Sequence, residues 1–269
     1  MFSACLKKDI LEQFRRKKFY IFLALAIGIA FLSIFSTFLI STIMKSIDFS
    51  EMGDMGEMVG IFGDDYYASI STFMSYMITY FIIVVTCMVM NAISKEIKNK
   101  VWVAPMCSGI KSSHMILSKI IAYTLSTVTT AIAACLVHLI FTVILFNPSE
   151  MATVGNLFAC YGTFLLFLIF TVVVTMSINA ISKRGWVAPV IMITLLILGT
   201  SVMQIVEIGE FTTLIMYTPY AFYDLCYNIP SFAAMGALEW VVSSLTYVGI
   251  IVLMLTLAIS SNKIKASKN

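Results

Sequence analysis

The chain has 269 residues, of which 60% are hydrophobic and only 12% are charged. A soluble domain usually carries about 25% charged residues. The polar residues of this chain are too few to cover its apolar residues in water, which excludes a soluble fold. Disorder is excluded because disordered segments are poor in apolar residues. An outer-membrane barrel is excluded because its strands alternate polar and apolar residues, whereas the apolar runs here are continuous. Composition therefore predicts an all-α polytopic membrane protein, with room for about six spans of about 20 residues.

Six apolar runs predict six transmembrane helices in a single membrane domain that covers residues 1–269. The first run is too long for a cleaved signal peptide, whose apolar region has 7–15 residues, so we expect it to be retained. Short turns at 147–150 and 182–185 separate three of the spans. The expected spans are 19–44, 67–93, 120–146, 152–181, 187–206 and 236–260.

Residues 1–18 predict a cytoplasmic amphipathic helix at the membrane interface. Leu6, Ile10 and Phe14 recur every four residues, Leu11 lies beside them, and basic residues occupy the opposite face. Such a helix binds anionic head groups. The pattern fits an anchor for the first span equally well as a packing element for a cytoplasmic partner.

The basic residues predict the orientation of the chain. Alternate segments on one side are the N-terminus, 94–119, 182–185 and the C-terminal tail. All 17 Lys and Arg except Lys45 fall on that side, and all 14 acids except Asp9, Glu12 and Glu96 fall on the other. Because cytoplasmic loops carry the excess of Lys and Arg, we expect a multi-pass protein of the cell membrane with both termini in the cytoplasm.

Motifs for chemistry are absent from the sequence. It has no P-loop, no metalloprotease motif and no Gly-x-Ser-x-Gly, so we expect no enzyme, no catalytic residue, no metal and no cofactor bound by this chain, and no nucleic-acid partner. The six cysteines form no Cys-x-x-Cys pair. Cys87, Cys135 and Cys160 lie in apolar runs and are predicted to be small core residues.

The middles of the expected spans carry no acidic or basic residue, which argues against a proton-coupled transporter. His138 lies in the third span, where a helix–helix hydrogen bond is favoured over a proton relay. Asn91, Asn156 and Gln204 are interpreted in the same way.

A short sequence repeat occurs where two spans return to the basic side. Residues 91–95 (Asn-Ala-Ile-Ser-Lys) recur at 179–183, and residues 102–105 (Trp-Val-Ala-Pro) recur at 186–189. A duplicated half-transporter would repeat over a longer stretch. We interpret the two copies as similar sequences at the points where two membrane helices end on the cytoplasmic side. An old duplication is the alternative.

The segment 94–119 is longer than a connector needs and contains Trp102, Val103 and Met106, which are expected to be exposed. Exposed aromatic and Met side chains on a charged loop are typical of docking surfaces. The segment resembles the loop after the second helix of ABC-2-type ABC transporter permeases, which starts with Glu and ends with Gly-Lys. Glu96 matches the first residue and Lys119 the last. The pattern departs at Lys100-Val101, Gly109 and Ser118, where that family has Gly-Thr, Pro and Gly.

The resemblance extends over the whole layout and implies a permease subunit that works with a separate ABC ATP-binding subunit, which binds ATP and Mg. It also implies a second permease chain, as a homodimer or heterodimer, and outward transport of a hydrophobic or amphipathic substrate such as a peptide, drug or lipid-like molecule. Peptide-antibiotic (lantibiotic) export or immunity is one such role. The loop would then be the coupling helix. The residues expected to couple it to the ATPase are Glu96, Lys98, Lys100, Trp102, Val103 and Met106.

Two other classes stay open. A membrane enzyme needs clustered carboxylates or His near the cytoplasmic surface, and the basic side has only three scattered acids. A membrane sensor or immunity protein that does not transport is the second. Co-purification of an ATP-binding subunit separates the transporter from the enzyme.

Two external segments complete the prediction. Acids spaced by three residues alternate with Met in the segment 45–66; the acids are Asp48, Glu51, Asp54 and Glu57. Simple solvation is favoured there, then attraction of a cationic substrate, then a metal such as Cu(I) on the Met sulfurs.

The segment 207–235 is too short for two spans and rich in aromatic residues. We expect a re-entrant helical pair that forms an extracellular gate, and the family resemblance points the same way. The alternative is an aromatic interfacial belt. The gate residues would be Tyr217, Pro219, Tyr220, Phe222 and Tyr223.

Overall fold

In the computed structural model of the chain, the described residues are 2–46, 66–145, 154–206 and 237–266, and every regular element among them is helical. The long single helices are α2 (Lys18–Ser46), α8 (Ser112–Leu145), α9 (Val154–Ser182), α10 (Val187–Val206) and α13 (Ala237–Ala266). A further long rod consists of α4 (Tyr66–Tyr76), a π-helical turn η1 (Met77–Phe81) and α5 (Ile82–Val89). Three shorter helices are α1 (Phe2–Arg15), α6 (Ser94–Lys98) and α7 (Val103–Cys107).

Five helical segments of the described chain are long and apolar enough to cross a membrane. They start at Lys18, Ser69, Ser112, Cys160 and Val241, and α10 contributes a shorter apolar stretch, Val187–Leu196. Many large apolar side chains point outward from these helices, among them Phe35, Leu125 and Ile140. An apolar outer surface on long helices is what lipid contact requires. The predicted all-helical class is therefore confirmed for the described residues, with five helical segments suited by length and composition to cross a membrane.

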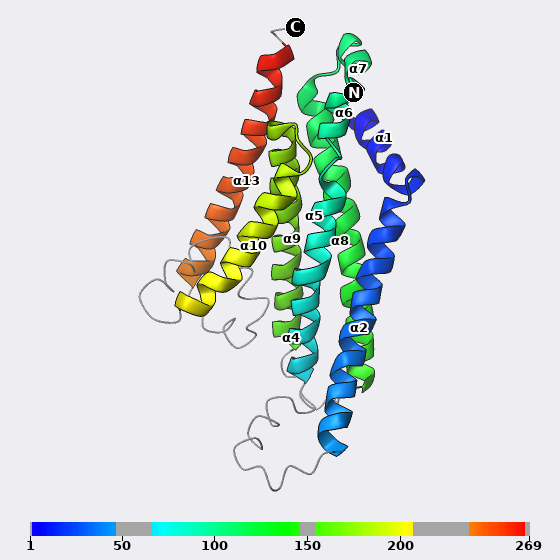
Figure 1. Cartoon of the computed structure of the whole chain (residues 1–269), viewed down its shortest axis with the longest axis vertical. Coiled ribbons are helices and arrows are strands. Elements are labelled where there is room, and N and C mark those ends of the chain that lie inside the picture. Colours follow the sequence, from blue (N-terminus) through cyan, green and yellow to red (C-terminus); the bar gives the residue numbers. More distant parts are fainter. Residues whose placement is uncertain (1, 47–65, 146–153, 207–236, 267–269) are drawn as a thin grey trace.

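The long helices lie side by side and run alternately up and down (Figure 1). Helix α2 packs on α8, α8 on α9, and α9 on both α10 and α13. One end of the bundle, uppermost in Figure 1, holds α1, α6, α7, the α9–α10 turn and the C-terminal end of α13. We call this the basic end, because the described segments there carry nearly all of the Lys and Arg.

The bundle interior contains one well-connected polar group. His138 of α8 is fully buried, and its Nδ1 lies 3.0 Å from the hydroxyl of Tyr161 on α9. Its Nε2 lies 3.3 Å from Ser69 Oγ on α4, and its ring stacks on Phe73. The predicted helix–helix hydrogen bond of His138 is therefore confirmed.

Three other predictions about polar and cysteine residues have mixed outcomes. Cys135 and Cys160 are buried as predicted, but Cys87 is exposed on α5, so its assignment to the core is wrong. A thiol is small and apolar enough to face lipid as easily as a core. Asn91 is exposed at the end of α5. The side chains of Asn156 and Gln204 lie outside the described part.

The third membrane helix begins earlier than the sequence predicts. Helix α8 starts at Ser112, whereas the charged segment was expected to continue to Lys119. The helix runs through Lys119 because the ammonium group meets three carboxylates there. The remaining helix ends agree with the predicted spans within a few residues, except that α13 continues to Ala266, past the predicted end at 260.

Helix α1 lies against α8 with a face different from the one that the apolar pattern suggests. Its buried residues are Asp9 and Gln13, whereas Leu11 and Phe14 are exposed. Leu11 and Phe14 thus remain available to the membrane interface, whereas Ile10 is half-buried near α8 and Asp9 turns toward the bundle.

Candidate functional site

The segment between α5 and α8 forms two short helices at the basic end. Helix α6 is followed by a turn in which Lys100 adopts a left-handed φ of 55°, and α7 ends before Gly109, whose φ is 88°. Gly adopts this region freely, whereas Lys there is uncommon. These two positions reverse the chain on each side of α7, so that α7 lies at the outer end of the loop.

A buried ion cluster holds this loop to the rest of the protein. Lys119 Nζ lies 2.8 Å from Glu96 Oε1 of α6, and the Lys119 side chain is only 5% exposed. The same ammonium lies 3.5 Å from Asp9 Oδ1 and 3.7 Å from Glu12 Oε2, both on α1. One Lys of α8 therefore links α6 and α1, which are distant in the sequence.

Neutral donors and one further cation complete the cluster. Trp102 Nε1 donates to Glu96 Oε2 at 2.8 Å, and Ser118 Oγ donates to Asp9 Oδ2 at 2.5 Å. Arg16 pairs with Glu12 at 3.0 Å on the more exposed side. Only about 20 Å³ of space remains among these side chains, enough for about one water molecule. The cluster is thus a closed structural joint with no room for a substrate.

Three carboxylates face one ammonium group in the cluster, and Asp9 is the most deeply buried of the three. Burial raises the pKa of the Asp9 carboxyl above its ordinary value, while Lys119 and the Ser118 hydroxyl oppose that shift. Desolvation penalises the charged form of a carboxyl. Burial therefore makes the ionised form of Asp9 less favourable than that of an exposed Asp.

The predicted coupling residues divide into an interior set and an exposed set. Trp102 is 5% exposed, so the expectation that it lies on the surface is wrong: its indole packs in the core and donates to Glu96. The Glu96 side chain is only 13% exposed, and its carboxylate is bound by Lys119 and Trp102. Met106 is partly buried against the core.

The exposed set forms a small surface that we call the loop tip, consisting of Lys100, Val101, Val103, Ala104 and Cys107. Val103 is 52% exposed although its neighbour Trp102 is buried. Lys98 is also exposed, but it lies on the other side of the loop, where it lines a cleft with the α9–α10 turn. The buried cluster thus supports a tip that combines apolar and basic side chains.

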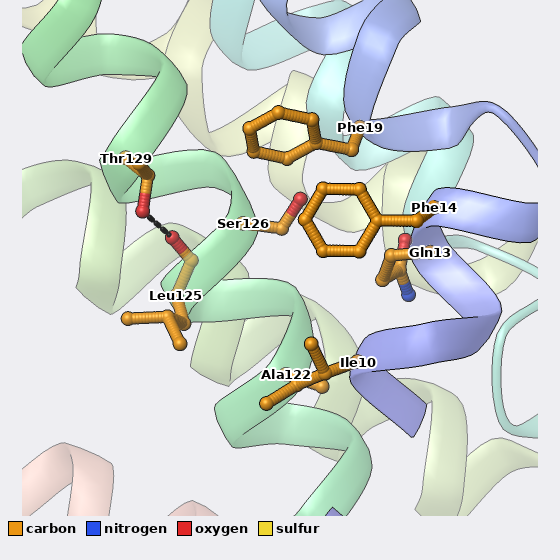
Figure 2. Close-up of a pocket in the computed structure, with 8 residues that line it drawn as sticks. All are labelled: Ile10, Gln13, Phe14, Phe19, Ala122, Leu125, Ser126 and Thr129. Carbon is orange, nitrogen blue, oxygen red and sulfur yellow. Dashed lines mark hydrogen bonds between the residues drawn. The ribbon is translucent and has the colours of Figure 1, made fainter. Parts of the chain in front are cut away.

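A second hollow at the basic end lies between α1, the start of α2 and α8, and has a volume of about 170 Å³. Figure 2 shows the rings of Phe14 and Phe19 beside Ser126, with Ile10 next to Ala122. Small residues on α8 allow α1 to approach closely here. The lining is mainly apolar and brings together no group of catalytic or ligand-binding chemistry.

The remaining predicted site residues lie outside the described residues. These are the four spaced acids, Asp48, Glu51, Asp54 and Glu57, and the five gate residues, Tyr217, Pro219, Tyr220, Phe222 and Tyr223. Among the residues that the structure describes, no group of three or more His, Cys, Asp or Glu could hold a metal ion.

The sequence singles out Glu96 and Lys119 as the ends of the loop, but it does not predict that they touch, nor that Asp9 and Glu12 join them. One signal was available. Asp9, Glu12 and Glu96 are the only acids on the basic side, and a lysine next to an apolar run needs a partner. The chain matches no protein-family model and no curated protein.

Proposed function

We propose that the chain is the permease subunit of an ABC-2-type exporter and that the loop tip contacts a separate ATP-binding subunit. The observation that carries the proposal is the anchored loop. Its outer helix α7 presents apolar side chains at the end of a membrane bundle, while Glu96 and Trp102 are fixed beneath it by Lys119. A surface that transmits movement to membrane helices has to be joined firmly to one of them, and Lys119 joins it to α8.

The proposal includes six crossings with both termini in the cytoplasm. Helix α10 is a helix of 20 residues between two long apolar helices, which supports counting it as the sixth. The gathering of basic segments at one end supports placing that end in the cytoplasm. Further parts of the proposal are a second permease chain, a hydrophobic or amphipathic substrate, and a gate formed by 207–235.

Orientation can be tested with the natural cysteines. A membrane-impermeant maleimide is expected to miss Cys107, which is exposed at the loop tip, in intact cells and to label it after permeabilisation. Labelling of Cys107 in sealed cells would reverse the proposed orientation.

The partner can be tested by affinity purification from native membranes in mild detergent. We expect stoichiometric recovery of one P-loop ATPase, with ATP hydrolysis in the purified complex. Val103→Asp places a charge in the apolar loop tip and is expected to reduce that recovery. Ser3→Asp, on an exposed position of α1 at the same end, is the matched control and should leave recovery unchanged. If a folded Val103→Asp protein retains the ATPase, the loop tip is not the surface that contacts it. If no P-loop ATPase is recovered with the wild-type protein, the proposed permease function is wrong.

A further inference from the structure

The two copies of the short sequence repeat meet in space and form a cleft at the basic end. The first copy contributes the end of α5 and helix α6, and the second contributes the turn between α9 and α10. The cleft has a volume of about 580 Å³ and opens to the outside of the bundle. Its lining residues are Asn91, Ser94, Lys95, Lys98, Asn99, Lys183, Arg184, Gly185 and Trp186.

The two walls of the cleft are held against each other by specific contacts. Asn179 Nδ2 donates to the carbonyl oxygen of Val89 at 3.1 Å, which ties α9 to the end of α5. Gly185 approaches the other wall so closely that a Cβ atom there would lie 2.1 Å from Asn91 Oδ1 and 3.0 Å from the Met90 carbonyl oxygen. The base of the cleft is therefore formed by packed backbone.

The charge of the cleft is strongly positive. Two cations, Lys95 and Lys98, come from α6, and two more, Lys183 and Arg184, come from the α9–α10 turn, whereas no acid is among the lining residues. Glu96 is the neighbouring acid in the sequence, but its carboxylate is bound to Lys119 and Trp102 on the other side of α6. Lys95, Lys98 and Arg184 alone place three like charges around one hollow; like charges repel one another, and an anion bound between them relieves that repulsion.

The surface next to the cleft is suited to lipid. Trp186 lines the cleft and is exposed, and Val190, one helical turn further along α10, is exposed on the same face. Trp is enriched at the level of lipid head groups. The exposed apolar surface of Trp186 and Val190 continues from the basic cleft along α10 and could contact the acyl chains of a phospholipid. A free phosphate ion has no apolar part that would contact this surface.

We propose that this cleft binds the phosphate group of an anionic phospholipid, with Lys95, Lys98, Lys183 and Arg184 around the head group and the acyl chains along Trp186 and Val190. Basic pockets between membrane helices are known to select anionic head groups. The cleft joins α5–α6 to α9–α10, so a bound lipid would bridge the two halves of the repeat. The inference requires no ATP-binding subunit and is independent of the proposed transport function.

Native mass spectrometry of the detergent-purified chain tests the proposal with phosphatidylglycerol, phosphatidylcholine and inorganic phosphate as separate probes. Wild-type protein is expected to retain phosphatidylglycerol in preference to phosphatidylcholine. Lys95→Gln/Arg184→Gln removes one cation from each wall and should weaken retention about 30-fold, which corresponds to about 2 kcal/mol. Lys7→Gln/Lys111→Gln removes the same charge from exposed positions outside the cleft and should leave retention nearly unchanged.

Fluorescence of the natural Trp186 provides a measurement that does not depend on the charge variants folding. The part of the signal that is lost in Trp186→Phe should be quenched by phosphatidylglycerol with brominated acyl chains, and much less by brominated phosphatidylcholine. Equal quenching by the two lipids, or equal loss of retention in both double variants, would overturn the proposal. Full displacement of the lipid by millimolar inorganic phosphate would identify a free-phosphate site instead and would overturn it as well.

Discussion

Replacement of Lys119 by Met is expected to loosen both α1 and the α6–α7 loop. Lys119 is 5% exposed and faces three carboxylates, two of them within 3.5 Å. Removal of one partner from a buried ion pair costs about 3–5 kcal/mol, because the other charge is left unpaired. We expect the low end, about 3 kcal/mol, because Glu12 is partly exposed and keeps Arg16 as a partner. In domains of about 150–250 residues such a loss lowers the melting temperature by roughly 6–12 °C, and the shift in this 269-residue chain should lie near the lower value.

The assay combines thermal unfolding of the purified chain with cysteine labelling at Cys5. Cys5 borders the ion cluster and is partly buried, so release of α1 should speed its reaction with N-ethylmaleimide, as read from its own peptide. The combination of Glu96→Gln and Asp9→Asn should restore part of the stability lost in Lys119→Met, because it removes the unpaired charges. A melting temperature within about 2 °C of wild type for Lys119→Met alone, which is below about 1 kcal/mol, would refute the reasoning.

Asp9→Asn changes the same ion cluster but is expected to cost less stability than Lys119→Met. Because burial raises the pKa of Asp9 above its unfolded value of 3.8, the folded state binds the proton more tightly than the unfolded state. The stability contributed by Asp9 is therefore complete at low pH and falls as the pH rises through the raised pKa. Asp9→Asn should remove that decline and cost far less than Lys119→Met. A loss as large as that of Lys119→Met would show that the Asp9 charge itself is required.

Three further outcomes are expected. Glu96→Lys places a second cation against Lys119 and should make the α6–α7 loop accessible to protease. Glu96→Gln keeps a hydrogen-bond acceptor, so the loop should resist digestion. Equal digestion of the two variants would contradict the role of the Glu96 charge. His138→Leu should destabilise the bundle by about 1 kcal/mol, as is usual for hydrogen bonds between membrane helices. It should leave the pH dependence of the proposed transport unchanged, and a shifted pH dependence would favour a proton relay through His138 instead. Gly185→Ala should lower the melting temperature because its Cβ would clash with Asn91 Oδ1. Adding Asn91→Ala should recover part of that loss. If it does not, the clash is with the backbone carbonyl of Met90 and not with the Asn91 side chain.

The sequence predicts the membrane helices well because their signal is local. A continuous apolar run predicts a span whatever its neighbours in the fold are. Helices α2, α9 and α10 start and end close to the predicted residues, and α13 starts close to its predicted residue but continues to Ala266, past the predicted end at 260. The distribution of Lys and Arg likewise predicts that the described segments nearest both chain ends lie at the same end of the bundle, as Figure 1 shows.

The candidate site is less predictable because its contacts are formed between distant segments. Trp102 looks like a surface residue in a charged loop, and only the position of Glu96 in the fold explains its burial. The start of α8 is missed for the same reason, since Lys119 resembles a loop residue until its partners on α1 are known. Cys87 shows the converse limit: an apolar run does not reveal which face of a membrane helix meets protein and which meets lipid.

The measurement that tests the proposed coupling role most directly is photo-crosslinking from Cys107. This thiol is naturally exposed on the loop tip, so a benzophenone maleimide attached there in native inside-out membranes samples whatever contacts α7. We expect a single major adduct whose partner is a P-loop ATPase, and we expect that adduct to be lost in Cys107→Ser. An adduct pattern without any ATPase, obtained from membranes in which Cys107 is fully labelled, would contradict the account.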